Sequence, residues 1–372
     1  MTECVLVTGG AGFIGRHLIN ALLQRGYEVR VLDSLLEQVH PGDRPRDPVL
    51  RHVEFVHADI RDADVVRRAL HGVDKLIHLA AEVGVGQSMY AVDRYVSVND
   101  HGTAVLFQQL IDRPVGRIVV ASSMSIYGEG LYQTRCGRVV EDATRCSQRS
   151  LSAGWDPAGP DGNPLQPIAT PEWKRPNLAS VYALTKYAQE RLTLTLAPAY
   201  GMDGVALRLF NVYGPGQALS NPYTGVLAIF ASRLLNNERP LVFEDGAQRR
   251  DFVHVEDVAR AFVLALERPE AAGRVFNIGS GRNVSILEVA CNIAGAMGRP
   301  HLEPEVIGKA RMGDIRHCFG DITLAQSELG YRPRRNFADS LDELAAWVEQ
   351  QQQAIDRVAE ARRELELRGL VA

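Results

Sequence analysis

Residues 4–18 read CVLVTGGAGFIGRHL, an apolar run that leads into a glycine-rich turn and then into a helical pattern. Gly9, Gly12 and Gly15 recur at every third position. Between a strand and a helix, such glycines let the backbone turn sharply and approach a pyrophosphate, while the helix N-terminus faces the negative charge. Glycines at these positions would also suit a tight strand-to-helix turn that binds no ligand. The choice between the two depends on the rest of the chain.

Apolar runs of strand length alternate with amphipathic segments of helix length over the first 210 residues. The helical segments include GRHLINALLQRG (15–26) and DADVVRRALHG (62–72). This alternation predicts right-handed βαβ units and a parallel sheet that helices cover on both faces. We therefore predict an α/β fold with a doubly wound parallel sheet, a Rossmann fold. The expected strands are CVLVTG (4–9), EVRVLD (28–33), VEFVHAD (53–59), KLIHLAA (75–81), RIVVASS (117–123) and VALRLF (205–210).

Beyond Phe210 the elements become shorter and the loops richer in glycine and proline, which predicts a smaller α/β lobe over the carboxyl edge of the sheet. The strand-like RVFNIG (274–279) is expected to return to the main sheet, so the smaller lobe is discontinuous in sequence. The charge-rich C-terminal tail has a thin apolar stripe and is expected to be a solvated helix, or else a partner contact. The expected units are a dinucleotide-binding domain (1–210 and 250–277) with an insert at about 130–178, a substrate lobe (211–249 and 278–350) and the tail (351–372).

Composition narrows the class of function. The chain has 372 residues, 46% of them hydrophobic, and a formal net charge of −4 without a basic stripe, so we expect no nucleic-acid partner. We also expect no membrane association and a cytoplasmic location, because no apolar run approaches a membrane span and no leader pattern precedes the first strand. Five widely spaced cysteines favour reduced thiols over a disulfide framework.

Asp33 ends the second expected strand, eighteen residues after Gly15. A carboxylate there can accept hydrogen bonds from both hydroxyls of an adenosine ribose and repels a 2′-phosphate. The sequence therefore favours NAD over NADP as the dinucleotide. Asp59, after the third strand, could reach the adenine or could instead cap the next helix.

A second group of residues suggests the chemistry. Tyr182 and Lys186 stand four residues apart on an expected helix and so share one face. A nearby ammonium favours the phenolate form and brings the pKa of a tyrosine closer to neutral pH, which suits proton transfer. Ser123, at the carboxyl end of a strand, could hydrogen-bond a reacting alcohol or carbonyl, or could cap the next turn.

With these motifs in order, the chain resembles the extended short-chain dehydrogenases/reductases, specifically the nucleotide-sugar epimerase and dehydratase family. The resemblance covers nearly all of residues 4–335. It implies that Tyr182 is the catalytic base, Lys186 its partner and a cofactor ligand, and Ser123 the catalytic hydroxyl. The matching motifs are TGGAGFIG (8–15), HLAA (78–81), SSMSIYG (122–128), YALTK (182–186), LRLFNVYGPGQ (207–217), RRDFVHVEDVA (249–259) and FNIGSG (276–281).

The resemblance also implies the remaining contacts. The NAD-binding residues would be Gly9, Gly12, Phe13, Ile14, Gly15, Asp33, Asp59, Ile60, Leu79, Ala80, Ala81, Asn99, Tyr182 and Lys186. The residues that hold the nucleotide-sugar substrate would be Gln87, Ser88, Ser123, Met124, Ser125, Asn211, Arg250 and Arg311. For each arginine a surface ion pair is the alternative.

The reaction follows from two positions. The 4,6-dehydratases of this family carry an Asp-Glu pair where this chain has Met124 and Ser125, so dehydration is disfavoured and epimerisation remains. The resemblance then implies transient oxidation at C4 to a 4-keto sugar and re-reduction on the opposite face. Segments such as GVGQSMY (84–90) and RMGDIRHCFGDI (311–322) are similar to bacterial dTDP-L-rhamnose 4-epimerases, and Met89 and Met124 could face a C6 methyl group or pack in the core.

Other readings of the sequence stay open. The substrate could be UDP-glucose or UDP-glucuronate, the reaction could be that of a dehydratase or oxidoreductase of the same family, or the protein could bind NAD without turnover. We interpret the insert as a proline-rich flap near the sugar and predict no metal, because Cys136 and Cys146 alone do not complete a tetrahedral site. The apolar surplus of segments 94–110 and 180–197 predicts a homodimer, since the family pairs these helices.

Overall fold

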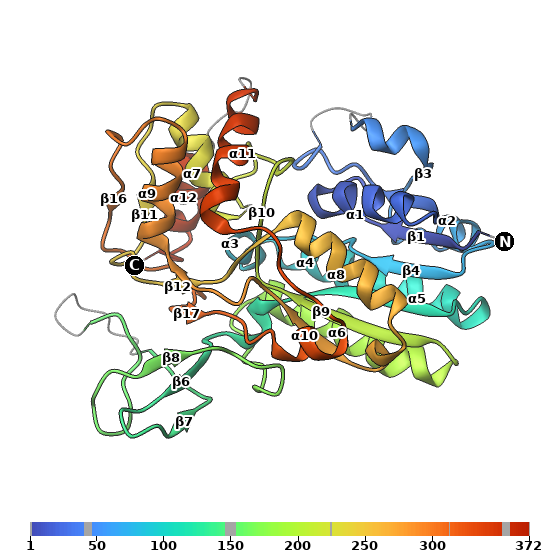
Figure 1. The fold of residues 1–372 in the computed structure, drawn as a ribbon, viewed down its shortest axis with the longest axis horizontal. Helices are drawn as coiled ribbons and strands as arrows, with labels where there is room; N and C mark the ends of the chain where they lie inside the picture. The colour runs from blue at the N-terminus through green and yellow to red at the C-terminus, as the bar shows by residue number, and fades with distance from the viewer. Residues whose placement is uncertain are drawn as a thin grey trace.

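The computed structural model describes residues 2–40, 47–145, 154–223, 225–311, 313–351 and 358–371. Its main feature is a sheet of seven strands in the order β14-β9-β5-β4-β1-β2-β3, with every pairing parallel. The predicted doubly wound α/β fold is confirmed (Figure 1). The strands are β1 (Cys4–Thr8), β2 (Glu28–Asp33), β3 (Glu54–His57), β4 (Lys75–His78), β5 (Arg117–Ser123), β9 (Asp203–Leu209) and β14 (Val275–Ile278).

Strand β14 lies within RVFNIG (274–279), the segment expected to return to the main sheet, and it pairs with β9 at the edge of this sheet. Alternate side chains of the strands point to opposite faces, as Val5 and Val7 do on one side and Leu6 on the other. Each face therefore has a core of its own. Helices α1 (Phe13–Gln24), α8 (Val255–Glu267) and α10 (Thr323–Glu328) cover the first face, and α2 (Ala63–Ala69), α5 (Gly102–Asp112) and α6 (Val181–Ala199) cover the second.

The segment after β4 runs into a nearly continuous helical stretch with one widened turn. Short helices α3 (Val85–Ser88) and α4 (Val92–Tyr95) lead to η2 (Val96–His101), a π-helical turn that continues into α5. Widened turns of this kind often occur at functional sites. Here the turn places Asn99 between two other elements, where its side chain bonds to the backbone of Glu82 and to Thr185 of α6.

The smaller lobe packs α7 (Val226–Leu235), α9 (Ile286–Ala296) and α11 (Phe337–Glu349) around one apolar cluster (Figure 1). Helix α9 begins at a capping box between Ser285 and Glu288. Short sheets connect this lobe to the rest of the chain. They consist of β10 (Asn211–Tyr213) with β13 (Phe252–His254), β11 (Leu241–Val242) with β16 (Glu305–Val306), and β12 (Arg249–Arg250) between β15 (Val284–Ser285) and β17 (His317–Cys318).

The insert forms a separate antiparallel sheet, with β6 (Leu131–Gln133) between β7 (Val139–Val140) and β8 (Gln166–Ile168), at the lower left of Figure 1. Charged groups attach the insert to the substrate lobe. The buried Arg316 guanidinium bonds to Asp156 of the insert and to Glu244 and Asp245 of the lobe. Arg145 of the insert likewise pairs with Glu244. Short 3₁₀ turns complete the chain: η1 (Pro48–His52), η3 (Met124–Tyr127) and η4 (Pro269–Ala271).

The tail does not behave as the expected solvated helix. Helix α12 (Val358–Leu367) returns to the body of the protein, where Ala361 and Leu365 are buried. Its apolar stripe is thin, but it covers apolar surface beside α3, since the Leu365 methyl groups lie 3.6 Å from the position of a Cβ on Gly86. No described helix combines the length and the hydropathy that a membrane-spanning segment needs.

Candidate active site

A cavity of about 1820 Å³ lies between the carboxyl edge of the main sheet and the smaller lobe. One part of its wall comes from the glycine-rich turn and from the residues that follow β2, β4 and β5. The other part comes from described residues of segment 209–230, from Arg250 of β12 and from the loop before β17. In an open α/β sheet, ligands bind outside the carboxyl ends of the strands, which is where this cavity is found.

The glycine-rich turn has no room for side chains. Gly9 adopts a φ of +71°, and a Cβ there would lie 2.7 Å from the backbone nitrogen of Ala80. A Cβ on Gly15 would collide with the backbone of Gly10. Gly12 begins helix α1 without a side-chain cap, so the first backbone N–H groups of that helix are left for a ligand. This cradle fits a dinucleotide pyrophosphate.

Asp33 lies at the end of β2 and lines the cavity, as expected. Its carboxylate accepts hydrogen bonds from the backbone N–H groups of Ala11 (2.9 Å) and Leu35 (2.8 Å), which fixes its position beside the glycine-rich turn. Asp59 also lines the cavity. Its pKa is lowered by hydrogen bonds from Arg61, and the cap of α2 is Asp62, so Asp59 does not serve as the helix cap.

The catalytic candidates meet at the carboxyl end of β5. Ser123 is the last residue of that strand, and Tyr182 and Lys186 come from the first two turns of α6. Ser180 begins α6 by accepting a hydrogen bond from the N–H of Ala183, and this fixes the start of the helix immediately before Tyr182. All three candidates line the cavity.

Electrostatics at this site differ from the sequence-based argument in one respect. Burial raises the pKa of the Tyr182 phenol above its ordinary value, although a hydrogen bond with Ser123 acts in the opposite direction. The lowering expected from the nearby ammonium is therefore wrong, since the pKa is raised. Burial also lowers the pKa of Lys186 to about 7, against the charge of Glu190, so this lysine carries only part of a positive charge at neutral pH.

The far end of the cavity carries the residues expected to hold the substrate. Arg250 extends from β12, and its guanidinium donates to the carbonyl oxygens of Ile315 and Arg316. Arg311 lies over the ring of Phe243 and pairs with Asp314. Asn211, on β10, has a buried Oδ1 atom with no hydrogen-bond partner among the described residues. A ligand that donates hydrogen bonds would satisfy this atom.

Twenty of the residues predicted from the sequence line this cavity. They are Gly9, Gly12, Phe13, Ile14, Gly15, Asp33, Asp59, Ile60, Leu79, Ala80, Ala81, Gln87, Ser123, Met124, Ser125, Tyr182, Lys186, Asn211, Arg250 and Arg311. The structure does not bring Asn99 or Ser88 to its wall. The Asn99 carboxamide is engaged behind the wall by Glu82 and Thr185, and the Ser88 hydroxyl donates to the carbonyl of Val85.

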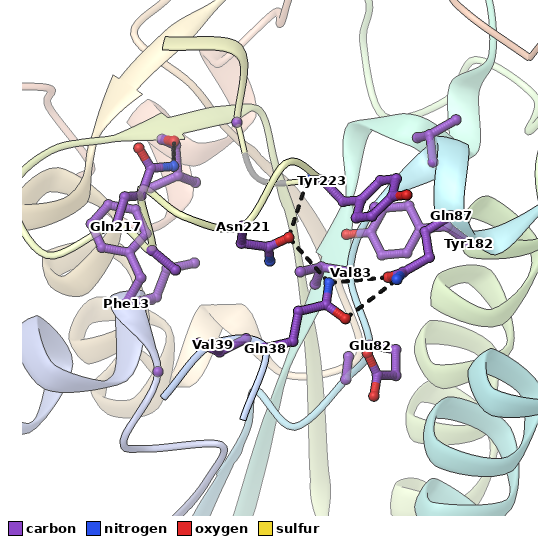
Figure 2. Close-up of a pocket in the computed structure, with 18 of the residues that line it drawn as sticks. Phe13, Gln38, Val39, Glu82, Val83, Gln87, Tyr182, Gln217, Asn221 and Tyr223 are labelled. Carbon is purple, nitrogen blue, oxygen red and sulfur yellow. Dashed lines mark hydrogen bonds between the residues drawn. The ribbon is translucent and has the colours of Figure 1, made fainter. Parts of the chain in front are cut away.

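Sequence reasoning missed several polar residues of the cavity wall. Figure 2 shows Gln38, Gln87 and Asn221 joined by hydrogen bonds across the cavity, with Tyr182 nearby. Gln38 follows β2 whereas Asn221 belongs to the loop after β10, so these amides link the two sides of the cavity. Gln217 and Gln248 each have a buried Oε1 atom without a partner in the described part of the chain. Of these residues, Gln87 was expected from the sequence. No local motif marks Gln38, Asn221 or Gln248, and Gln217 ends the stretch YGPGQ.

The described part of the insert does not form a flap over the cavity. Among the described residues, the lining passes from Ser125 directly to Tyr182, and no insert residue contributes to it. The insert instead supports the loop that holds Arg250, because Glu129 accepts hydrogen bonds from the backbone N–H groups of Arg316 and His317. The ion pairs between the insert and the smaller lobe fix the insert on the outer side of that loop.

The described residues contain no group of three or more His, Cys, Asp or Glu side chains suited to a metal ion. Cys136 is exposed, and Cys146 lies outside the described residues. The two methionines expected near the sugar lie in different pockets. Met124 lines the main cavity, whereas Met89 lies in a small adjoining pocket with Val85, Leu365 and Leu370, under helix α12.

Comparison with known proteins agrees with this geometry. The profile of the NAD dependent epimerase/dehydratase family matches residues 5–279. The dTDP-L-rhamnose 4-epimerase of Burkholderia thailandensis is 38% identical over 93% of this chain and 95% of its own length. The putative UDP-glucose 4-epimerase of Methanocaldococcus jannaschii is 30% identical over 92% of this chain and 98% of its own length.

Solved structures give the same result. The UDP-glucose 4-epimerase of Thermus thermophilus, in complex with NAD, superposes with a TM-score of 0.74 at 30% identity, over 94% of this chain and 100% of its own. The cradle for a pyrophosphate, the serine, tyrosine and lysine beside it, and the match over most of the chain all agree. This chain belongs to the NAD-dependent epimerase/dehydratase family.

Proposed function

We propose that this protein is an NAD-dependent 4-epimerase of nucleotide sugars, with a dTDP-linked 6-deoxyhexose as substrate and dTDP-L-rhamnose as the specific candidate. The observation that carries the proposal is the position of Ser123, Tyr182 and Lys186 in one cavity, between a pyrophosphate cradle and the arginines of the smaller lobe. The cradle and Asp33 would hold NAD, and Arg250 and Arg311 would hold the diphosphate of the sugar nucleotide.

The proposed chemistry assigns a proton to a named atom. Tyr182 accepts the proton of the C4 hydroxyl through its phenolic oxygen, and Ser123 donates a hydrogen bond to the same sugar oxygen. NAD, when bound, supplies a positive charge that favours the phenolate, and it takes up and returns the hydride of C4. Lys186, whose pKa burial lowers to about 7, stabilises the phenolate when it carries its proton. The arginines keep the diphosphate fixed while the 4-keto sugar presents its other face.

We prefer epimerisation to dehydration because of the two residues that follow Ser123. Elimination of water from a hexose needs an acid and a base near C5 and C6. Met124 and Ser125 occupy the following positions, and both side chains are buried in the cavity wall. A thioether cannot donate or accept a proton, and a serine hydroxyl is a poor acid or base at neutral pH.

A 6-deoxy sugar is preferred for two reasons. The B. thailandensis relative named a dTDP-L-rhamnose 4-epimerase is 38% identical to this chain, against 30% for the M. jannaschii relative named a putative UDP-glucose 4-epimerase. In addition, Met124 supplies an apolar and adaptable surface to the cavity near Ser123, which suits a methyl group better than a hydroxymethyl or carboxylate group.

The test is direct. Protein purified without added NAD is incubated separately with dTDP-L-rhamnose, UDP-glucose and UDP-glucuronate, and the sugar ring is followed by proton NMR. Inversion at C4 of dTDP-L-rhamnose supports the proposal. Inversion of only the UDP sugars would reject the rhamnose assignment and keep the epimerase, whereas a 4-keto product together with released NADH would reject both.

We also propose a homodimer. Val92, Val96 and Leu184 are exposed by 46%, 40% and 50%, and they lie on α4, η2 and α6, which contact one another on the second face of the sheet. A second copy that packs against these helices would cover this apolar surface. Sedimentation at micromolar concentration should show a dimer, and the variant Leu184→Arg should shift it toward monomer. Wild-type protein that sediments only as a monomer would contradict the proposal.

A further inference from the structure

Gln189 is buried directly beside Lys186. The two residues stand three positions apart on α6 and therefore share a face of the helix. The Lys186 ammonium donates a hydrogen bond from Nζ to Oε1 of Gln189 at 2.6 Å. Gln189 is 0% exposed and Lys186 is 3% exposed, so water does not compete for this bond.

The Gln189 carboxamide can take only one orientation. Its Nε2 atom lies 3.3 Å from the carbonyl oxygen of Ala80, which can only accept a hydrogen bond. Nε2 also lies 2.9 Å from the hydroxyl of Thr103, whose own proton goes to the carbonyl of Asn99. Because these partners fix the nitrogen, the oxygen of the amide must face Lys186.

His78 completes this arrangement from the main sheet. Its Nε2 lies 3.1 Å from Nε2 of Gln189, and its Nδ1 lies 2.7 Å from the hydroxyl of Thr8. Burial, and to a smaller extent the charge of Lys186, lower the pKa of His78 to about 3, so the imidazole is neutral. A neutral imidazole carries one N–H. Its Nε2 also lies 2.9 Å from the Thr103 hydroxyl, so this nitrogen either donates to Thr103 or accepts from Gln189, and Nδ1 takes the complementary role toward Thr8.

We propose that Gln189 is a positioning residue for the reaction, which holds the Lys186 ammonium at one N–H through an amide whose two N–H donors are fixed by Ala80 and Thr103. This inference rests on the proposed function. An ammonium has three N–H donors. With one of them bound to Gln189, the other two remain for the cavity, where a ribose diol of the dinucleotide would accept them. The bond also favours the charged form of a lysine that burial would otherwise deprive of its proton.

Other charges near Lys186 do not replace this bond. Glu190 lies on the next position of α6, but its carboxylate is engaged by Ser122 and by the guanidinium of Arg208. His78 is neutral, and Tyr182 lies one turn earlier with its ring edge-on to Tyr95. Gln189 is thus the group whose oxygen contacts the ammonium, whereas Glu190 acts on it at longer range.

The experiment compares Gln189→Leu, which removes the acceptor, with Gln189→Glu, which replaces it by a carboxylate. In Gln189→Leu, kcat should fall about tenfold or more at pH 8 while KM for the sugar nucleotide changes less than about threefold. The alkaline limb of the kcat pH profile should move about one to two pH units lower, because Lys186 loses its proton sooner. In Gln189→Glu the same limb should move higher. Thr193→Val is the control, since it removes a buried hydroxyl that donates to the backbone carbonyl oxygen of Gln189 without touching its side chain or Lys186.

A second readout needs no turnover. The phenolate absorbance of Tyr182, taken as the difference from Tyr182→Phe protein, should titrate at higher pH in Gln189→Leu and near its wild-type pH in Gln189→Glu. This readout separates the role of Gln189 from the proposed function. Even if the wild-type protein turned over no nucleotide sugar, the pH at which Tyr182 titrates would still differ between wild type and Gln189→Leu. If Gln189→Leu does not fold, the kcat pH profile of Gln189→Glu tests the role of Gln189, since its alkaline limb should move higher. Unchanged pH dependence in both readouts would overturn the role of Gln189.

Discussion

A Cβ placed on Gly9 would lie 2.7 Å from the backbone nitrogen of Ala80, closer than a Cβ atom approaches a nonbonded atom. The contact joins the turn after β1 to the segment after β4, and both line the cavity. The same backbone that would clash with a side chain is therefore part of the surface that would receive the pyrophosphate. Any side chain at Gly9 must push these two segments apart.

The substitution Gly9→Ala is therefore expected to abolish retention of NAD in the purified protein. The left-handed φ of +71° costs an alanine about 1–2 kcal/mol by itself. Gly26→Ala is the matched control, since Gly26 has a φ of +83° but nothing within 4 Å of its Cβ position. It should lower the melting temperature and keep NAD, as measured by release and absorbance of the nucleotide. Equal NAD content in both variants would contradict the account of the turn.

Replacement of the catalytic phenol should separate chemistry from binding. Tyr182→Phe is expected to fold and to bind NAD nearly as well as the wild type, with turnover reduced at least about a hundredfold because a general acid/base is lost. Lys186→Ala should weaken both cofactor binding and turnover. Steady-state kinetics and bound-nucleotide content are the measurements, and wild-type activity in Tyr182→Phe would rule out the proposed mechanism.

Helix α12 offers a test of the substrate end. Leu365 is 7% exposed against α3 and lines the cavity, whereas Leu367 on the same helix is 73% exposed. Leu365→Asp should detach α12 and raise KM for the sugar nucleotide about tenfold or more, with NAD content unchanged. Leu367→Asp should behave like the wild type. Equal kinetics of the two variants would show that α12 takes no part in substrate binding.

His78 predicts a pH dependence of stability. Its pKa is about 3 in the folded protein and 6.5 as the ordinary value, so between these values the unfolded chain binds a proton that the folded one does not. The free energy of unfolding should therefore fall as the pH is lowered from about 6.5 toward 3, by about 2 kcal/mol at pH 5 from this group. Urea unfolding at pH 7.5 and 5.0 should show a smaller loss in His78→Asn than in the wild type. The exposed His71 gives the control His71→Asn, which should lose as much as the wild type.

The parts of the site that sequence predicts are those determined by local spacing. Gly9, Gly12 and Gly15 follow from a strand-to-helix turn, and Tyr182 and Lys186 from the helical repeat. The doubly wound sheet follows from the alternation of strands and helices, and even the return of β14 could be read from its sequence. All of these need only a few neighbouring residues.

What the sequence does not predict depends on residues far apart in the chain. The contact of Gln189 with His78 joins positions 111 residues apart, and that of Gln38 with Asn221 joins positions 183 apart. Asn99 was expected to bind NAD, but its side chain turns toward Thr185 and not toward the cavity, because a widened helical turn redirects it. The thin stripe of α12 predicted a solvated helix or a partner contact, yet two buried side chains are enough to hold this helix where an apolar surface is already present.

The central claim is that C4 loses and regains the same hydrogen within one binding event. The most direct measurement is epimerisation of dTDP-L-rhamnose in D₂O without added NAD, with the deuterium content of each ring carbon read by NMR and mass spectrometry. Hydride transfer within a closed cavity predicts inversion at C4 with hydrogen retained at C3, C4 and C5. Deuterium at C3 or C5 would show that the sugar is inverted by proton abstraction from carbon, and deuterium at C4 would show exchange with solvent. Either result would contradict the account.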